Sequence, residues 1–266
     1  MILYELERRP GVTGRRGGAE DVDWIYGRNV VQLALAPGAR RRAHRLAATV
    51  AALKALGGAV PAGLPVDVVA SHELDEITGG RDHQGAALQV DAFRHAEIAE
   101  ILRADIIVVL DEVSDPRNVG AVARSAAAAG AGGLVLPKHR SASVTPAAVK
   151  ASAGVIEHLP VAQVTNVVGF LKIAKAEGFW VYGAAGGVAT TFWRLDLAGR
   201  VVFVLGAEGN GLRPLVARTC DALAAIPMAS RVESLNVSVA AALFLFEASR
   251  QRAQGTGGAP LGGGVS

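Results

Sequence analysis

The sequence predicts an α/β protein in which a parallel β-sheet is covered by helices on both faces and is preceded by a smaller α/β unit. From residue 106 onward, short apolar stretches alternate with helix-type stretches, an alternation that implies parallel strands. Three of the predicted strand ends carry unusual polar or glycine-rich residues. With 266 residues, 51% of them hydrophobic and 19% charged, the chain is long and apolar enough for two modest domains.

The first domain is expected at residues 24–92, after a flexible basic arm at 1–23 that shows no periodicity. Asn29 is expected to cap a short helix that ends before Pro37. Residues 40–56 fit a second helix, because their leucines fall on one face and Gly57 and Gly58 follow. The unit should also contain a buried strand at 66–70, a short helix at 71–77 capped by Ser71, a turn at 82–85 and a strand at 86–90.

The second domain is expected at residues 105–253, after a linker at 93–104. Its strands are predicted at 106–110, 133–136, 179–183, 201–205 and 222–226. Its helices are predicted at 119–129, 146–151, 166–178, 212–219 and 237–248, with Thr145 capping the second of them. The glycine-rich tail at 254–266 has low complexity and is expected to be disordered.

The positive charge of the chain is concentrated near its beginning. Residues 1–50 hold nine Arg and five acids, whereas the rest of the chain holds 18 basic and 19 acidic residues. A localised basic surface suggests an anionic partner, with nucleic acid as the first candidate, although a solvated charged face remains the alternative. No apolar run reaches the ~20 residues of a membrane helix, no secretory signal is evident, and Cys220 is the single cysteine, so we expect a cytoplasmic protein that does not enter a membrane.

The stretch at 227–248 combines a polar loop with a helix that is apolar on all sides. A helix of that composition is expected to be buried. Ser234 and Asn236, at its entrance, are residue types that cap helices. A polar loop held by a buried helix suits a functional site, although a plain helix cap is the simpler interpretation.

Two further loops follow predicted strands. In the first, Asn118 is expected to cap a helix of small residues, and Arg124 on that helix can reach back toward the loop because helical side chains lean toward the N-terminus. The alternative is an exposed arginine on an alanine-rich helix. The second loop, at 206–211, has the spacing G-x-x-G-x-G, which differs from the dinucleotide fingerprint, and it carries Glu208.

The three loops should meet, because the carboxyl ends of parallel strands lie at one edge of a sheet and ligands bind there. The sequence contains no Ser-His-Asp set, H-E-x-x-H motif or Cys/His cluster, so we expect neither a metal centre nor covalent catalysis. The chemistry that remains is the positioning of two substrates for a direct displacement.

The fuller motifs are specific. DPRNVGAVARSA, VLGAEGNGL and IPMASRVESLNVSVAAALFLFEA, in this order, resemble motifs one to three of the SpoU (TrmH-like) RNA 2′-O-ribose methyltransferases. YGRNVVQLAL and HQGAAL resemble the substrate-binding domain of the same family. The nearest subfamily is similar to the RlmB type, which methylates a guanosine ribose in 23S rRNA. The resemblance implies a SPOUT-type parallel sheet with a deep trefoil knot, S-adenosylmethionine (SAM) as cofactor, a homodimer and an RNA substrate.

The resemblance also implies functional residues. The catalytic positions would be Asn118, Arg124, Glu208, Ser234 and Asn236, and the backbone around Gly206, Ile226 and Leu235 would hold SAM. The basic N-terminal domain would contact RNA through Arg28, Asn29, Arg40, Arg41, Arg42, His83 and Gln84. The sequence departs from the family at Ser230, Arg231 and Glu233. A tRNA substrate, a non-catalytic RNA-binding protein and a nucleotide-dependent oxidoreductase remain the alternatives.

Overall fold

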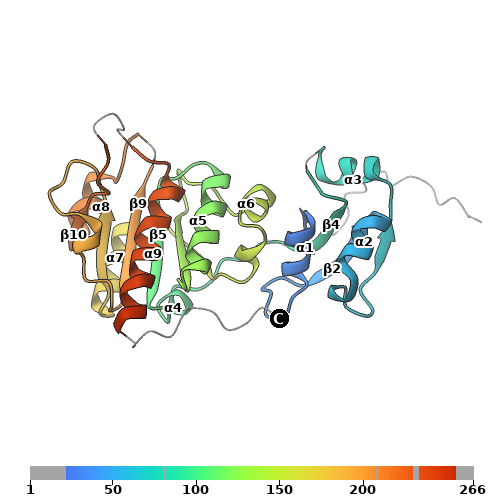
Figure 1. Cartoon of the computed structure of the whole chain (residues 1–266), viewed down its shortest axis with the longest axis horizontal. Helices are drawn as coiled ribbons and strands as arrows, with labels where there is room; N and C mark the ends of the chain where they lie inside the picture. Colours follow the sequence, from blue (N-terminus) through green and yellow to red (C-terminus); the bar gives the residue numbers. More distant parts are fainter. Residues whose placement is uncertain (1–21, 81, 208, 230–233, 256–266) are drawn as a thin grey trace, which may run out of the picture.

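The computed structural model describes residues 22–80, 82–207, 209–229 and 234–255, which form two α/β units side by side (Figure 1). The N-terminal unit contains β1 (Val22–Tyr26), α1 (Arg28–Ala34), β2 (Ala43–Ala48), α2 (Val50–Leu56), η1 (Gly57–Ala59), β3 (Val66–Val68), α3 (Ser71–Thr78) and β4 (Ala86–Asp91). Its sheet has the order β1-β4-β2-β3, with β4 antiparallel to β1 and β2, and β2 parallel to β3. The expected arm lies outside the described residues up to position 21.

The prediction of one helix over residues 40–56 is wrong. Residues 43–48 form β2, a central strand in which Leu46 pairs with Leu88 on one side and Val66 on the other. Pairing on both edges outweighs the helical spacing of the leucines, since strand formation depends strongly on cross-strand context. The helix begins only after Thr49, whose hydroxyl accepts the Ala52 N–H at 3.2 Å.

Three predicted helix caps differ in the structure. Gly27 precedes α1, so that Asn29 lies inside the helix. Ala70 precedes α3, and the Glu73 carboxylate accepts the Ala70 N–H at 2.7 Å, where Ser71 was expected to cap. Asp115 caps α5 through the Arg117 N–H at 2.8 Å, which moves the helix start to Pro116 and leaves Asn118 in the first turn. In each case the backbone turns one to three residues earlier than periodicity indicated.

The second unit contains β5 (Ile106–Asp111), β6 (Gly133–Pro137), β7 (Val161–Val164), β8 (Trp180–Ala184), β9 (Val201–Gly206) and β10 (Ala222–Ala224). Its helices are α4 (Ile98–Ile101), α5 (Pro116–Ala128), α6 (Pro146–Ala151), α7 (Val167–Ala176), α8 (Pro214–Thr219) and α9 (Val237–Gly255), with short 3-10 turns η2 (Val155–Glu157) and η3 (Phe192–Arg194). The six strands are parallel in the order β10-β8-β9-β5-β6-β7. Of these six strands, β7 alone was not predicted; it has four residues, and the polar Gln163 interrupts its apolar run.

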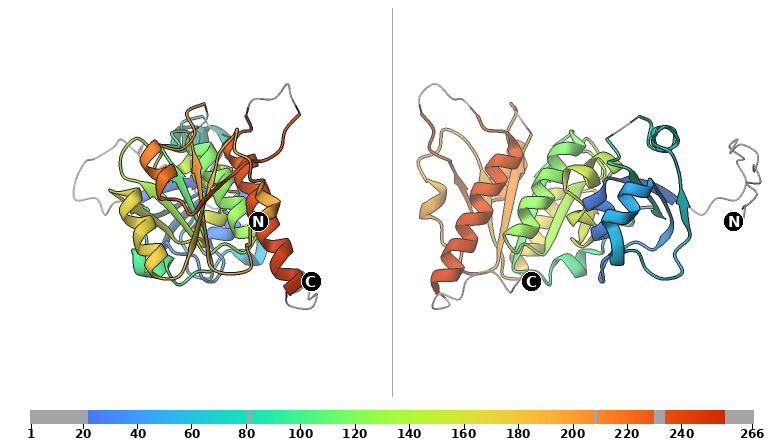
Figure 2. Two further views of the ribbon diagram at one scale, coloured as in Figure 1. Left: turned by 90° about the vertical axis from the view of Figure 1, so that its left-hand side faces the viewer. Right: turned by 45° about the vertical axis from the view of Figure 1, so that its right-hand side comes forward.

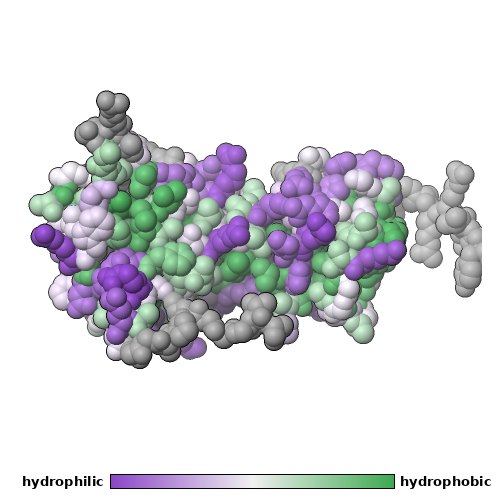
Figure 3. Space-filling model, viewed as in Figure 1, coloured by the Kyte–Doolittle hydropathy of each residue, from purple (hydrophilic) through white to green (hydrophobic). Residues whose placement is uncertain are grey.

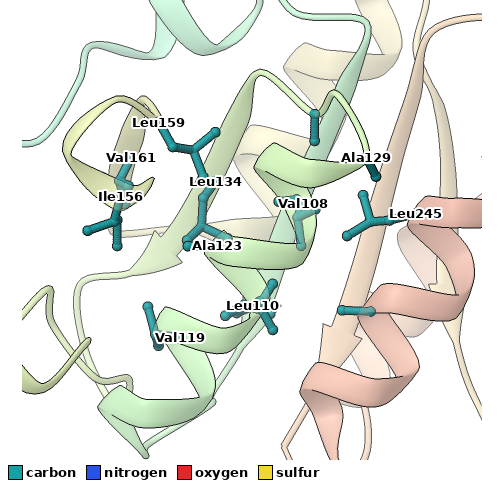
Figure 4. Close-up of a cluster of buried hydrophobic side chains, with 14 of the residues drawn as sticks. Val108, Leu110, Val119, Ala123, Ala129, Leu134, Ile156, Leu159, Val161 and Leu245 are labelled. Carbon is teal, nitrogen blue, oxygen red and sulfur yellow. The ribbon is translucent and has the colours of Figure 1, made fainter. Parts of the chain in front are cut away.

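Helices cover both faces of this sheet, as the alternation of strands and helices predicted. Helices α5 and α9 lie together on one face (Figures 1 and 2). The α5 residues Val119 and Ala123 pack toward Val108 and Leu110 of β5, and Leu245 of α9 lies on the other side (Figure 4). The apolar residues of α7 and α8 pack against the opposite face of the strands. Successive residues of β5, such as Val108 and Val109, therefore point to opposite faces of the sheet and belong to two different apolar cores.

The expectation that the apolar helix at 237–248 is buried on all sides is wrong. One side of α9 packs on α5 and β9 through Ala241, Phe244 and Leu245. The other side is open to solvent: Val239, Leu243 and Phe246 are 48%, 38% and 51% exposed. Figure 3 shows this green apolar area on the surface over α9. The helix also extends to Gly255, beyond the predicted end; the remainder of the expected tail, 256–266, lies outside the described residues.

The two units are joined by a continuous apolar core and by a buried ion pair. Residues of α1, such as Val30 and Val31, belong to the same cluster as Ile156 of η2. Arg41 donates from Nε to Glu157 Oε2 at 2.8 Å, and a second guanidinium nitrogen pairs with Glu157 Oε1. The side chains of Arg41 and Glu157 are only 4% and 0% exposed. The orientation of the two units is thus set by packing as well as by the chain that connects them.

Among the described residues, no helix is long and apolar enough to cross a lipid bilayer.

Candidate active site at the carboxyl edge of the sheet

The predicted loops meet at the carboxyl ends of two neighbouring strands whose following helices lie on opposite faces of the sheet. Strand β5 leads into α5 on one face of the sheet, whereas its neighbour β9 leads into α8 on the other face. Ligands of parallel α/β sheets bind in the crevice at such a switch point. The third loop enters α9, which packs beside α5 on the same face of the sheet (Figure 2).

Asn118 and Asn236 are 118 positions apart in the sequence but are hydrogen-bonded in the structure. The Asn236 amide donates from Nδ2 to Asn118 Oδ1 at 3.0 Å. Asn236 Oδ1 accepts the backbone N–H of Ser238 at 2.8 Å and its hydroxyl at 2.6 Å. Asn236 is therefore both the cap of α9, as its residue type indicated, and the link between the loops of the first and third motifs.

A cavity of about 250 Å³ lies at the carboxyl ends of β8, β9 and β10 and against α9, and Leu235 and Val237 on either side of Asn236 line it. Its size is close to the lower end of ligand pockets. All three positions expected to hold the cofactor, Gly206, Ile226 and Leu235, line it, and so does Ser234. The other lining residues are Ala184, Ala185, Gly186, Leu205, Ala207, Gly209, Gly211, Ala224, Met228, Val237, Ala240 and Phe244. Among the described residues of its wall, none carries a charge.

The loop after β9 folds back so closely that Gly206 admits no side chain. A Cβ at Gly206 would lie 2.1 Å from the carbonyl of Gly211 and 2.5 Å from the Leu212 nitrogen. The Gly211 N–H donates to the Ala207 carbonyl at 2.9 Å. This compact turn presents peptide groups to the cavity, which is the physical reason for a glycine-rich sequence here.

The remaining expected catalytic residues lie in different situations. The Arg124 side chain is on the exposed surface of α5, two helical turns after the start that Asp115 caps. It is therefore open to a ligand that approaches from solvent, although the exposed position is also what the simpler interpretation of this arginine predicted. Glu208 lies outside the described residues, as do Ser230, Arg231 and Glu233, where the sequence departs from the resembled family.

The residues expected to contact RNA fall into two groups. Arg28, Asn29, Arg42 and Gln84 are exposed, and the Arg28 N–H donates to Gln84 Oε1 at 3.3 Å. The second group, Arg40, Arg41 and His83, forms ion pairs with acidic residues of the protein; Arg41 and His83 are buried, whereas Arg40 is exposed.

Arg40 pairs with Glu100, and its Nη2 lies 3.1 Å from Glu100 Oε2. Arg41 is buried against Glu157, and His83 is 8% exposed and lies 3.2 Å from Asp75. The guanidinium of Arg41 therefore faces another part of the protein and not solvent, in contrast to the role expected for it. The count of charged residues in the sequence could not distinguish these two groups, because it contains no information about which side chains are buried or ion-paired.

Sequence reasoning missed two charged residues at the site. Asp111, the last residue of β5, is 0% exposed, and Arg213 binds it with Nε 2.8 Å from Oδ1. The bond to Asp111 raises the pKa of Arg213. An acid at the end of an otherwise apolar strand was the available signal, since an ionised carboxylate is rarely buried without a partner.

The described residues offer little other reactive chemistry. Burial raises the pKa of the Cys220 thiol to about 11, so this cysteine is no thiolate nucleophile near neutral pH. Among these residues, no three His, Cys, Asp or Glu side chains gather as metal ligands would. The arrangement is suited to holding and orienting two bound molecules.

Comparison with known families accounts for most of the chain. Residues 105–246 match the SpoU rRNA Methylase family. Residues 24–96 match a domain described as RNA 2′-O ribose methyltransferase substrate binding.

Several relatives are similar over long stretches. A tRNA/rRNA methyltransferase of Mycobacterium ulcerans is 40% identical over 92% of this chain and 81% of its own. The 23S rRNA (guanosine-2′-O-)-methyltransferase RlmB of Xylella fastidiosa strain Temecula1 is 44% identical over 71% of this chain and 79% of its own. A tRNA/rRNA methyltransferase of Synechocystis is 41% identical over 71% of this chain, which spans about half (51%) of that relative's length.

Solved structures show the same architecture. The SpoU methyltransferase AviRb from Streptomyces viridochromogenes in complex with AdoMet, which is SAM, has a TM-score of 0.74 with 25% identity, over 90% of this chain and 92% of its own. An RNA methyltransferase of the TrmH family from Porphyromonas gingivalis has a TM-score of 0.73 with 27% identity, over 87% and 91%. These neighbours confirm the expected fold class, a SPOUT-type parallel α/β sheet preceded by a small α/β substrate-binding domain.

Proposed function

The chain belongs to the SpoU rRNA methylase family, and from this premise we propose that it methylates the ribose of a guanosine in large-subunit rRNA. The reaction is SAM-dependent transfer of a methyl group to a ribose 2′-hydroxyl of RNA. The similarity to RlmB supports the finer target. The observation that carries the proposal is the convergence of the three motif loops, with the Asn118–Asn236 bond beside a cavity of peptide and apolar groups. An rRNA target would place the protein in the cytoplasm with the ribosome.

The cavity fits the cofactor. Leu205, Ile226 and Phe244 give it apolar walls that suit an adenine ring, and the glycine-rich turn after β9 provides peptide N–H and C=O groups for polar atoms. The described side chains that line it are uncharged, and among them recognition depends on shape and on backbone hydrogen bonds. When bound, SAM supplies an electrophilic methyl group, and the protein's own part is to hold and orient the attacking hydroxyl.

Arg124 is proposed to position the ribose and its neighbouring phosphate. Arginine is a poor general base because its pKa exceeds ~12. Its fixed fork of N–H donors is well suited to a phosphate and to the negative charge that develops on O2′ as the new bond forms. The exposed position of Arg124 on α5 leaves its guanidinium accessible to RNA.

Asn118, Ser234 and Asn236 are proposed to orient the hydroxyl. The Asn118–Asn236 bond fixes both amides, so that their remaining donors and acceptors have defined directions. Ser234 lies on the cavity wall and adds a hydroxyl at the mouth. Glu208, which follows β9 in the sequence and lies outside the described residues, is proposed as the acidic member of this group. Precise orientation of a nucleophile is a major source of rate when no covalent step is used.

The N-terminal unit is proposed to bind RNA through its exposed residues. Arg28, Asn29 and Gln84 lie together, and Lys150 of α6 is close to them, since a Cβ at Gly27 would lie 2.6 Å from its Nζ and 3.3 Å from Gln84 Oε1. Arg42 provides a further exposed guanidinium. Contacts of this kind to phosphate anchor RNA without reading its sequence.

The activity is tested by transfer of labelled methyl from SAM to unmodified 23S rRNA, followed by nucleoside analysis. Label in 2′-O-methylguanosine is expected, and Arg124→Ala should abolish it while SAM binding persists. Arg124→Lys keeps the charge but loses the fork, and should remain strongly impaired. Label that appears only on tRNA would refute the rRNA target. RNA binding without any transfer would support a non-catalytic protein.

We also propose that the protein is a homodimer that pairs through α9. Val239, Leu243 and Phe246 recur at helical spacing on one exposed side, next to Phe192 of η3, and line a shallow groove. Exposed apolar patches of this kind mark interaction sites. A single helix face can pair with its own copy about a two-fold axis, which is the commonest symmetry of homo-oligomers.

Sedimentation velocity tests the dimer. Leu243→Asp is expected to yield monomers, because the charge would have to be buried in the contact. Val68→Asp is the matched control, since Val68 is 57% exposed on β3 in the other unit and its replacement should leave the mass unchanged. A wild-type protein that sediments as a monomer at all concentrations would refute this pairing.

A further inference from the structure

Asp111 is a buried acid at the foot of the loop that follows β9. Its carboxylate accepts the Arg213 backbone N–H at 3.0 Å and the Nε–H at 2.8 Å, and a further guanidinium nitrogen lies 2.6 Å from Oδ1. The Asp111 side chain is 0% exposed, while that of Arg213 is 42% exposed. A buried carboxylate with three N–H partners is well satisfied, so the pair forms a firm attachment point.

The attachment lies at both ends of the same loop. Asp111 is opposite Gly206 in the register of β5 and β9, and the chain leaves the sheet there. It returns at Arg213, which binds Asp111 and precedes α8. Asp111 therefore lies beside Gly206, where the chain leaves β9, and binds Arg213, where α8 is about to begin. Among the described residues between these two points, Ala207, Gly209 and Gly211 line the cavity.

The neighbouring acid joins two more loops to this point. Glu112 has a φ of 61°, in the left-handed region that is costly for a residue with a side chain. Its buried Oε1 accepts no hydrogen bond from any described residue, but it lies 3.7 Å from Arg213 and 3.6 Å from Arg140. The Ser141 hydroxyl donates to the Val113 carbonyl at 3.1 Å. The loops after β5, β6 and β9 are therefore tied together.

We propose that Asp111, acting through Arg213, is a positioning residue for cofactor binding. The pair holds the backbone at Gly206 and at Arg213, on either side of the described residues Ala207, Gly209 and Gly211 that line the cavity, in the position that binds the cofactor. These cavity-lining residues then need less ordering when SAM arrives. Ordering a loop on binding reduces affinity. This inference rests on the proposed function, and it predicts a defect in cofactor binding and not in the transfer step or in RNA binding.

The test is the double variant Asp111→Asn/Arg213→Gln, in which two neutral amides replace the ion pair and no charge is left buried alone. The Kd for SAM, measured by calorimetry on the full chain, is expected to rise ~10-fold. The KM for SAM should rise in parallel, with kcat at saturating SAM and the Kd for RNA within about twofold of wild type. Arg45→Gln is the matched control, because it removes the exposed Arg45–Asp67 pair of the other unit and should leave the Kd for SAM unchanged.

A second variant keeps the test decisive if the double variant does not fold. Arg213→Lys retains the charge and the backbone bond to Asp111 but loses the Nε contact, and should weaken SAM severalfold. A folded double variant, or failing that a folded Arg213→Lys variant, that binds SAM as wild type does would overturn the positioning role while leaving the proposed activity intact. Wild-type protein that binds no SAM would instead overturn the proposed function, and this role with it.

Discussion

The described part of the chain contains two pairs in which a carboxylate with no exposure binds an arginine, and they differ in what surrounds the arginine. Between the two units, Arg41 and Glu157 are both buried, and the guanidinium also lies 3.0 Å from Asp23. At the site, Asp111 is equally buried, but Arg213 is 42% exposed. The first pair is sealed by protein on all sides, whereas the second is open to solvent at the edge of the sheet.

This difference separates stability from function. A sealed pair has little to offer a ligand, and its residues are well placed to fix the orientation of the two units. An open pair keeps a loop in place and still leaves N–H groups and the loop itself in reach of a bound molecule. A carboxylate–guanidinium pair thus stabilises the contact between the two units in one region and positions a loop at the candidate site in the other.

The largest effect is expected from Glu157→Ala. The substitution leaves the Arg41 charge buried without its main partner, which typically costs ~3–5 kcal/mol of unfolding free energy. Urea denaturation followed by circular dichroism measures the change. Replacing both residues, as in Arg41→Met/Glu157→Leu, should recover most of the loss because no buried charge remains. If the single variant lost less than about 1 kcal/mol of unfolding free energy, the pair would not stabilise the contact between the two units.

A smaller loss of stability is expected from Arg213→Gln. Asp111 keeps the Arg213 backbone N–H as a donor, and solvent reaches the side of the pair where the arginine lies, so we expect ~1–3 kcal/mol. The same denaturation experiment applies. If Arg213→Gln destabilised the protein more than Glu157→Ala, the distinction between an open and a sealed pair would have to be abandoned.

The third prediction contrasts Arg41 with its neighbour. Arg42 is exposed and forms no ion pair with a described residue, so Arg42→Gln should weaken RNA binding about severalfold and reduce the salt dependence by roughly one ion contact, with stability unchanged. Filter binding at several salt concentrations measures this. Arg41→Gln should show the reverse pattern, with reduced stability. Equal effects of both variants on RNA affinity at equal stability would contradict the assignment.

The smallest effect is expected at the exposed pair of Arg40 and Glu100. The hydrogen bond from Arg40 lowers the pKa of Glu100 from its ordinary value of 4.5. Because the folded pKa is the lower one, the contribution to stability is present above about pH 4.5 and is lost as the pH falls through the folded pKa. Solvent screening limits it to under ~1 kcal/mol, so Glu100→Gln should change the melting temperature by only a few degrees at pH 7 and less at pH 3.5.

Local patterns predicted the second unit better than the first. Five of its six strands appear close to their expected places, and the rule that parallel strands present their carboxyl ends together predicted the meeting of Asn118 with Asn236. In the first unit, the leucines of 40–56 fit a helix, but pairing with β3 and β4 made a strand of residues 43–48. Helical spacing cannot reveal which neighbours a strand will find.

Burial was the second quantity that the sequence did not disclose. Arg41 and Arg42 are adjacent and identical in type, yet one is sealed against Glu157 and the other is exposed. An apolar helix was expected to be covered on all sides, but α9 leaves Phe246 in solvent. Both outcomes depend on contacts between distant parts of the chain. Asp111 was detectable only as an acid in an apolar strand, and its partner 102 positions away was not.

The absence of a side chain at Gly120 affects how the two units contact each other. At Gly120 of α5, a Cβ would lie 2.2 Å from the Ala148 carbonyl of α6, so the two helix backbones are in contact. Helix α6 in turn carries Lys150, which donates to the Asp82 carbonyl of the N-terminal unit at 2.9 Å. Any larger residue at position 120 must displace the backbone of α6, and with it the Lys150 contact to the N-terminal unit. The junction between the two units therefore depends on the size of one residue that lies in neither of the surfaces in contact there.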